Sequence, residues 1–267
     1  MLFRSDANLS GKTNNFLAAL YWDAGKGAGG LAWADVSTGD FSGIQGRKEA
    51  ELWQWAMKLA PSELLLPQDV ERPAEVELAA RITPLPLKPH FDTGQGKELL
   101  LAAQGVADLG VLDLDNKPEL VRACGALLAY LRQTQMQDSR HLNEFKPLNP
   151  TRHLLLDEVT ERNLELFRTL SGGRGKGTLV HVLDATLTPM GGRLLATRLR
   201  QPWRETGPIE KTQDAVALLH DDDGLRGELR ALLDGVYDLE RLSTRACLGR
   251  AMPKDLHALA GSLAALP

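Results

Sequence analysis

Residues 31–41, LAWADVSTGDF, decide the fold of the first half of the chain. Apolar and polar residues alternate over residues 31–36, which is the period of a half-buried strand. Turn-forming residues occupy positions 37–40, and a second apolar run begins at Phe41. Upstream, residues 15–23 form an apolar run with aromatic side chains, and a glycine-rich turn follows it. We therefore predict two or three neighbouring antiparallel strands here.

A helix and a further strand follow these strands. Residues 47–59 place Leu52, Trp55 and Leu59 on one helical face, and Pro61 closes the helix. Residues 63–66 are apolar enough for a short buried strand, and the proline-rich residues 73–89 predict a short helix and an edge strand. The order β-β-β-α-β predicts a mixed sheet with flanking helices.

The pattern changes to helical from Pro118 onward. Residues 136–150 are polar and contain two prolines, so we place the domain boundary near Met136. The prediction is an α/β domain over residues 1–135 and an all-α domain over residues 136–267. The segments with helical spacing are 118–131, 157–170, 189–200, 209–219, 225–233, 239–248 and 253–266.

Composition limits the classes of function. The 267 residues carry a formal net charge of −4, with 13 Lys+Arg against 17 Asp+Glu in residues 1–135 and 18 against 18 in residues 136–267. Strong DNA binding requires an excess of basic residues that neither half has, and the acidic first half favours a protein partner. Cys124 and Cys247 lack the spacing of a zinc site. We find neither a membrane-spanning run nor a secretory signal, so we expect a cytoplasmic protein.

Three patterns suggest chemistry, and each has a simpler explanation. Residues 172–178, GGRGKGT, invite comparison with a phosphate loop, but they do not fit GxxxxGK[ST], so we expect a loop between helices. His220 is followed by three aspartates, which favours an acidic loop over a metal site. The early strands resemble a ribonuclease-H-like sheet, in which Asp23, Asp35 and Asp40 would be the metal-binding acids of a nuclease. A fourth carboxylate is not evident, so we predict no catalytic, cofactor or metal site.

Arginines at positions 193, 198, 200 and 204 form a basic stretch without an intervening acid. Arg193, Arg200 and Arg204 can share one helical face, which could contact phosphate or an acidic protein surface. The alternative is a solvated face near a helix C-terminus, where the helix dipole favours cations.

Six stretches resemble the MutS family of bacterial DNA mismatch-repair proteins, and they occur in that family's order. The first two resemble its connector domain, and the other four resemble its helical core. They are residues 14–19 (NNFLAA) with 31–41, 61–67 (PSELLLP), 156–166 (LDEVTERNLEL), 181–195 (HVLDATLTPMGGRLL), 201–202 (QP) and 235–242 (GVYDLERL).

The resemblance implies a fragment: a ribonuclease-H-like connector without the catalytic acids, followed by the N-terminal part of the core. The Phe-x-Glu mismatch-reading domain, the clamp and the ATPase with its ATP and magnesium would lie in the rest of a parent protein. That parent is expected to bind mismatched duplex DNA and to form a homodimer, whereas this part binds DNA weakly or not at all. The connector would dock the MutL partner, with Gln95, Lys97 and Glu98 as exposed candidates, and the core would transmit the nucleotide state.

Two other hypotheses remain open at this point. One is the metal-dependent nuclease, and the other is a paralogue of the same family that acts on recombination junctions. The leucine-rich residues 253–267 also predict self-association if they are exposed.

Overall fold

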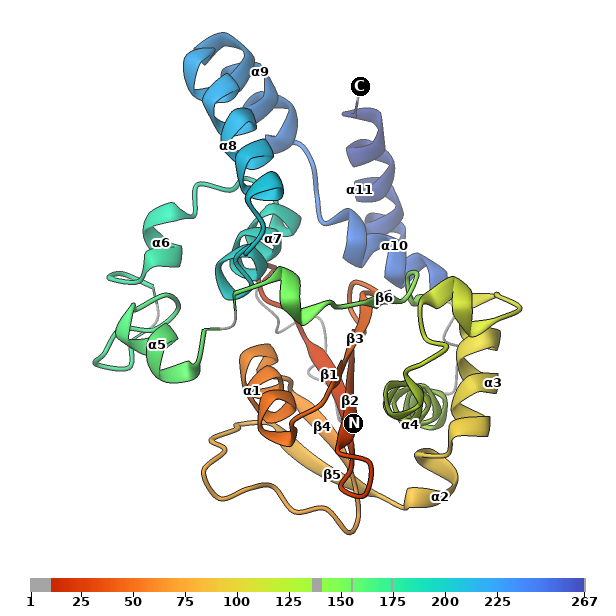
Figure 1. The fold of residues 1–267 in the computed structure, drawn as a ribbon. Coiled ribbons are helices and arrows are strands. Elements are labelled where there is room, and N and C mark those ends of the chain that lie inside the picture. Colours follow the sequence, from red (N-terminus) through yellow and green to blue (C-terminus); the bar gives the residue numbers. More distant parts are fainter. Residues whose placement is uncertain (1–10, 136–140, 155, 174, 267) are drawn as a thin grey trace. The chain divides into compact units, whose positions relative to one another are not determined.

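The computed structural model describes residues 11–135, 141–154, 156–173 and 175–266. The chain divides into two compact units. The first contains Asn14–Leu148, and the second contains Asn149–Pro267 together with residues 11–13. The chain therefore leaves the second unit after Thr13 and returns to it after Leu148. Figure 1 shows the helices and strands of both units, coloured along the sequence.

The first unit is built on a six-stranded sheet with the order β5-β4-β1-β2-β3-β6. β2 is antiparallel to both of its neighbours, whereas the other adjacent pairs are parallel, so the sheet is mixed as predicted. The strands are β1 (Phe16–Asp23), β2 (Ala28–Asp35), β3 (Phe41–Gly46), β4 (Glu63–Pro67), β5 (Arg81–Leu85) and β6 (Lys146–Pro147).

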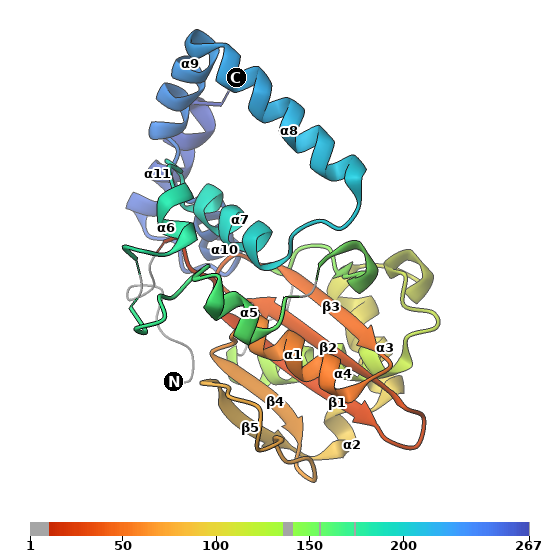
Figure 2. The ribbon, with the colours of Figure 1, turned by 60° about the vertical axis from the view of Figure 1, so that its left-hand side comes forward.

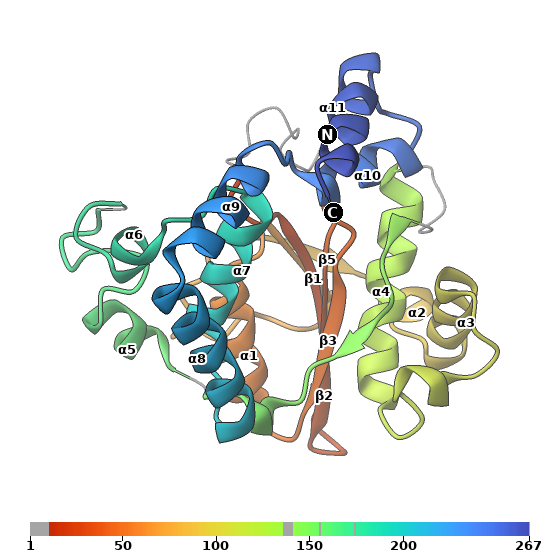
Figure 3. The same cartoon turned by 90° about the horizontal axis from the view of Figure 1, so that it is seen from above.

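Helices cover both faces of this sheet (Figure 3). α1 packs on one face and α4 on the other, while α3 packs on α4. β2 is consequently buried along its whole length, although the alternation in residues 31–36 predicted a half-buried strand. The helices of the unit are α1 (Glu49–Leu59), α2 (Leu87–His90), α3 (Thr93–Gln104) and α4 (Pro118–Gln135), with a 3₁₀ turn at Leu109–Leu112.

Glycine in β2 allows α4 to approach the sheet closely. A Cβ atom at Gly30 would lie 2.4 Å from the Cα of Leu120 in α4. Such a distance is well inside van der Waals contact, so a larger residue there would push the helix away. The close approach buries the apolar face of α4, including Leu120, Cys124 and Leu127, in the core of the unit.

The first unit extends past the boundary that we placed near Met136, a residue outside the described part of the chain. Residues 141–148 cluster with the first unit. The reason is local pairing, because β6 extends the sheet beside β3 and the ring of Phe145 packs edge-on against that of Phe41, with centroids 4.9 Å apart.

The second unit is helical, which confirms the predicted order of an α/β part followed by an α part. α8 and α9 form one helix pair, and α10 and α11 form another (Figure 2). The helices are α5 (Glu158–Asn163), α6 (Leu179–Leu183), α7 (Pro189–Arg200), α8 (Thr206–Asp221), α9 (Asp223–Asp234), α10 (Leu239–Cys247) and α11 (Pro253–Ala264), with a 3₁₀ turn at Pro150–Arg152.

The helix predicted over residues 157–170 is shorter than expected. α5 ends at Asn163, and Glu165 adopts a left-handed backbone conformation with φ of 48°. The carbonyls of Glu165 and Leu166 then accept hydrogen bonds from the amides of Leu179 and Val180. The backbone after α5 therefore forms hydrogen bonds with the first turn of α6 and does not continue the helix.

Candidate functional site

The candidate partner-binding residues lie on α3. Asp92 caps this helix, because its side chain accepts a hydrogen bond from the amide of Gln95 at 3.0 Å. Gln95, Lys97 and Glu98 are all exposed. The structure therefore places the three residues on the surface of the first unit, and their binding of a partner stays a prediction.

Packing of α3 against α4 determines which residues of α3 face outward. Gly96 is buried, and a Cβ atom there would lie 2.7 Å from the carbonyl oxygen of Val121 in α4. A Cβ atom at Gly125 of α4 would lie 2.5 Å from the Cα of Gly96. The two glycines thus bring the backbones into contact, and the flanking charged residues of α3 point away from the core.

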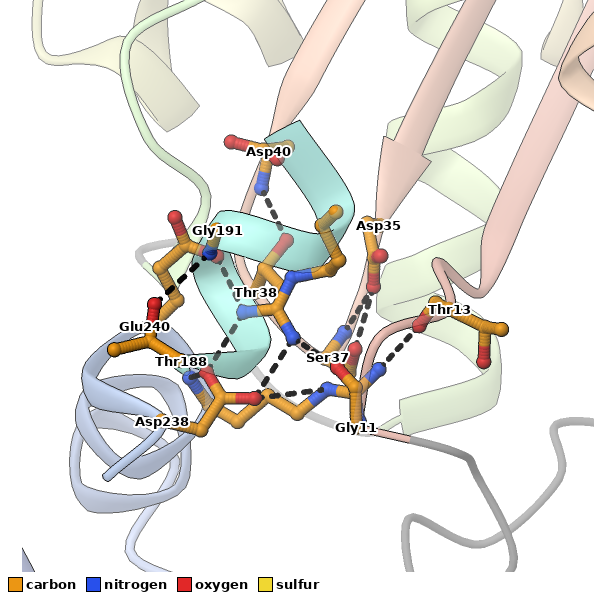
Figure 4. Close-up of polar contacts among 12 residues, drawn as sticks. Gly11, Thr13, Asp35, Ser37, Thr38, Asp40, Thr188, Gly191, Asp238 and Glu240 are labelled. Carbon is orange, nitrogen blue, oxygen red and sulfur yellow. Dashed lines mark hydrogen bonds and ion pairs between the residues drawn. The ribbon is translucent and has the colours of Figure 1, made fainter. Parts of the chain in front are cut away.

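Arg193, a candidate contact for phosphate or an acidic surface, lies inside the second unit. The residue is 5% exposed, and its guanidinium donates to both carboxylate oxygens of Asp238 at 2.7 Å and to Glu240 at 2.6 Å. Figure 4 shows these two carboxylates, which belong to the start of α10. The position predicted to be on a surface face is therefore buried, because acids distant in sequence surround it.

Charge compensation makes this cluster stable. Burial raises the pKa of Asp238, but hydrogen bonds and charge from Arg193 outweigh that effect and hold the pKa below its ordinary value. Burial lowers the pKa of Arg193, but hydrogen bonds and charge from Asp238 and Glu240 outweigh that effect and raise the pKa above its ordinary value. Arg193 and Asp238 are thus both charged near neutral pH, and their ion pair ties α7 to α10.

Residues 11–13 complete the cluster from the other end of the chain. Arg193 donates to the carbonyl oxygen of Gly11 at 2.6 Å, and Arg241 donates to that of Thr13 at 2.5 Å (Figure 4). Lys12 forms an ion pair with Asp184 at 2.9 Å. The hydroxyl of Thr186 and, after it, the ammonium of Lys12 lower the pKa of Asp184 despite the opposing effect of partial burial. This segment, which we call the N-terminal strap (residues 11–13), is therefore part of the second unit.

The other two candidate arginines lie elsewhere. The guanidinium of Arg200 stacks over the ring of Phe167, 4.0 Å from its centroid. Arg204 is exposed, and it lies beyond the end of α7. The shared helical face that we predicted for the three arginines therefore does not form, because Pro202 follows the helix and redirects the chain.

The acids of the nuclease hypothesis are separated. Asp23 pairs with Ala28 at one end of the β1–β2 ladder, whereas Asp35 pairs with Phe16 at the other. Seven residue steps lie between these ends, roughly 23 Å at about 3.3 Å per residue. A shared magnesium ion requires ligands about 2 Å from the metal, so these acids do not form one site.

Asp35 instead has a structural role. It is fully buried, and its carboxylate accepts a hydrogen bond from the amide of Asn15. It also accepts hydrogen bonds from the amide and the hydroxyl of Ser37 (Figure 4). Across the described ranges, no three His, Cys, Asp or Glu side chains gather as a metal site would require.

The described residues of the glycine-rich loop, 172, 173 and 175–178, differ from a phosphate loop in geometry as well as in sequence. Gly172, Gly175 and Gly177 adopt positive φ, and Thr178 caps α6, which has five residues. Lys176 precedes that cap, whereas a phosphate loop carries its lysine at the start of a longer helix. These residues therefore do not fit a nucleotide or its magnesium ion.

The sequence reasoning missed Asp238, Glu240 and the N-terminal strap. Asp238 and Glu240 lie within the family-like stretch 235–242, but a local pattern gives no indication that they meet an arginine 45 residues earlier. Nothing in residues 11–13 alone indicates that their carbonyls bind buried arginines.

Comparison with known proteins identifies the family. The model for MutS domain II matches residues 15–146, and the model for MutS domain III matches residues 159–267. The chain belongs to the MutS family. The first match lies within the first unit and the second within the helical unit. The N-terminal strap precedes the domain II match, yet it packs within the unit that contains the domain III match.

Curated MutS relatives are similar along nearly the whole chain. The DNA mismatch repair protein MutS of Nitratidesulfovibrio vulgaris is 60% identical over 263 residues, which cover 98% of this chain and 29% of the relative. The MutS protein of Oleidesulfovibrio alaskensis is 59% identical with the same coverage. That of Nostoc punctiforme is 38% identical over 277 residues, covering 97% of this chain and 30% of the relative. The chain thus spans about 29% of the length of the first of these relatives.

In the part of the chain that the structure describes, no helix is both long enough and apolar enough to cross a membrane.

Proposed function

We propose that this chain is the non-catalytic middle part of a DNA mismatch-recognition ATPase, which couples mismatch binding to nucleotide state and docks the MutL partner. The observation that carries the proposal is the match to MutS domains II and III, in that order, with relatives named as mismatch-repair proteins. In this proposal the whole protein is a homodimer that binds mismatched duplex DNA. Because bacterial DNA lies in the cytoplasm, the proposal places the protein there.

ATP and magnesium belong, in this proposal, to an ATPase domain of the whole protein and not to these residues. Residues 172, 173 and 175–178 support this assignment, because their geometry differs from that of a phosphate loop. Domain II and domain III would therefore supply coupling and docking rather than chemistry.

The connector role is proposed for the first unit, with a ribonuclease-H-like fold that no longer serves catalysis. Its strand order supports this assignment, because the antiparallel β2 lies between β1 and β3 and parallel strands follow on the other side of β1. The wide separation of Asp23 from Asp35 supports the loss of a metal-dependent activity.

MutL docking is proposed for the exposed face of α3, at Gln95, Lys97 and Glu98. A surface of mixed charge on a well-packed helix can bind a partner without rearranging the core. We test this with titration calorimetry of the full chain against the MutL protein of the same organism. The variant Gln95→Ala/Lys97→Glu/Glu98→Lys should bind at least tenfold more weakly than the unchanged chain.

The matched control is Lys254→Glu, which reverses an exposed charge on α11 in the other unit. It should leave the affinity unchanged. Equal affinity of the α3 variant and the control would move the docking surface elsewhere, and an absence of binding by the unchanged chain would contradict the docking role.

DNA binding by this part should be weak and sensitive to salt, because the net charge is −4 and Arg193 is buried in an ion-pair cluster. Exposed Arg204 remains available for a weak phosphate contact, and Arg200 is partly occupied by Phe167. Tight mismatch-selective binding or ATP turnover by this chain would contradict the proposal. Tight binding to a junction in preference to a mismatch would favour the paralogue.

A further inference from the structure

The chain crosses between its two units twice, after Thr13 and after Leu148. On the side of the second unit, the two crossing segments are the N-terminal strap (residues 11–13) and residues 149–154, which we call the return strap. Each is held by groups that adjoin one end of the same helix, α7.

The N-terminal strap is bound at the start of α7. Arg193, in the second turn, donates to the carbonyl oxygen of Gly11, and Lys12 reaches Asp184 and the carbonyl oxygen of Thr186 just before the helix. A Cβ atom at Gly192 would lie 2.6 Å from the side chain of Lys12. The strap therefore lies directly on the helix and is not tethered only through long side chains.

The return strap is bound just beyond the end of α7. The ring of His153 stacks on that of Trp203 at 4.6 Å, and its Nδ1 atom lies 3.0 Å from the carbonyl oxygen of Gln201. The guanidinium of Arg152 pairs with Glu205 at 3.2 Å. Two backbone hydrogen bonds, from Leu154 to Pro202 and from Arg204 to Arg152, fix the two segments side by side.

α7 itself can transmit a displacement from one strap to the other. Its 12 residues form one hydrogen-bonded helix, about 18 Å long at 1.5 Å per residue. Thr188 caps the start, where its hydroxyl oxygen accepts a hydrogen bond from the amide of Gly191. Through Arg193 the helix is also tied to Asp238 and Glu240 of α10.

We propose that α7 is a coupling helix, through which the two straps act on each other and on α10. Displacement of either strap moves the same rigid element, so the loss of one anchor weakens the hold of the other. Lys12 and His153 are positioning residues in this device, because each acts through its own strap. The inference deepens the coupling role in the proposed function and rests on that function for its biological meaning.

Amide hydrogen exchange, followed by mass spectrometry on the full chain, tests the proposal. Lys12→Ala removes the ion pair that anchors the N-terminal strap, and His153→Ala removes the ring stack that anchors the return strap. Each variant should raise exchange in peptides along the whole of α7 by at least about threefold, which exceeds the scatter expected for independent sites. In the double variant the rise should be smaller than the product of the two single effects.

The matched control is Lys48→Ala, which removes an exposed lysine–glutamate pair in the first unit and should leave α7 unchanged. Peptides from β1 and β2 report whether each variant keeps its native first unit. If His153→Ala unfolds the helical unit, Arg152→Ala takes its place, because it removes the ion pair between the return strap and Glu205.

Exchange that rises only in the turn next to each substitution, with effects that multiply in the double variant, would overturn the proposal. The experiment uses neither DNA, nucleotide nor MutL. If MutL does not bind at α3, the interpretation of the hydrogen-exchange experiment is unchanged. If the two straps prove independent of each other in that experiment, the docking proposal is unchanged.

Discussion

Replacing Arg193 with methionine tests how far the second unit depends on its buried ion pairs. The substitution keeps an unbranched apolar stem but removes hydrogen bonds to Asp238, Glu240 and the carbonyl of Gly11. Removal of one partner from a buried ion pair costs about 3–5 kcal/mol, because the other charge stays buried. Glu240 has a side chain that is 43% exposed and can turn to water, and Arg241 remains 3.8 Å from Asp238. We therefore expect a loss near the lower limit, about 3 kcal/mol.

Urea-dependent hydrogen exchange in peptides of α7 and α10 measures the free energy of unfolding of this unit. The matched control is Arg198→Met, which removes an exposed arginine from the same helix. It should change the free energy by less than about 0.5 kcal/mol. In a double-mutant cycle with Asp238→Asn, the combined loss should fall short of the sum by at least about 1 kcal/mol, because the two residues contact each other.

The same variant changes how stability depends on pH. The pKa of Asp238 is below its ordinary value in the folded state, so the cluster adds stability above the ordinary carboxyl pKa. That stability is lost as the pH falls through the lowered pKa, below about pH 4. Arg193→Met should lose this part of the acid sensitivity. The reasoning would be refuted if Arg193→Met lowered the free energy of unfolding by less than about 1 kcal/mol, as little as Arg198→Met does, and left the pH dependence of stability unchanged.

Three further predictions concern buried residues of the first unit, and one of them uses Cys247 of the second unit as its comparison. Gly96→Val should separate α3 from α4 and cost about 2–3 kcal/mol of unfolding free energy by urea denaturation, because its Cβ would meet backbone at 2.7 Å, whereas exposed Gly94→Ala should cost little. Burial raises the pKa of the Cys124 thiol, so iodoacetamide at neutral pH should modify exposed Cys247 alone, and mass spectrometry should find two adducts only in urea. Burial and a hydrogen bond to Glu63 raise the pKa of Tyr130 to about 12. The contribution of the protonated Tyr130 hydroxyl to stability should therefore hold below about pH 10 and be lost as the pH rises to 12. An ultraviolet titration in which every tyrosine ionises near pH 10 would contradict this.

Local rules were sufficient to predict most of the elements. The alternation in residues 31–36 and the turn after it produced β2 and β3, and Thr188 with Pro189 provides a cap and a first turn for α7. The prediction of a helix over residues 157–170 was wrong beyond Asn163, because the carbonyl of Glu165 accepts a hydrogen bond from the first residue of α6 instead of continuing the helix.

The candidate site was harder to predict, because its contacts are distant in sequence. The arginine spacing in residues 193–204 describes a helix surface, but the acids that bury Arg193 lie on α10, and Gly11 lies near the other end of the chain. Spacing within one helix carries no information about such partners. By contrast, the exposure of Lys97 and Glu98 is easy to predict, because charged side chains are rarely buried without a partner. The packing of Gly96 against α4 agrees with it, since both residues lie outside that contact.

This contrast separates two kinds of charged residue in the chain, and the separation can be tested. Arg193 is held by opposite charges in a buried setting, so its removal should change stability before it changes any binding. Lys97 and Glu98 are exposed, so their substitution should change stability by less than about 0.5 kcal/mol while it changes recognition. If docking at α3 and the hold of the straps on α7 are both correct, the two sets of variants should affect different measurements. A variant at Lys97 that destabilised α7, or one at Lys12 that weakened MutL binding directly, would instead show that the two units are coupled more strongly than their separate packing requires.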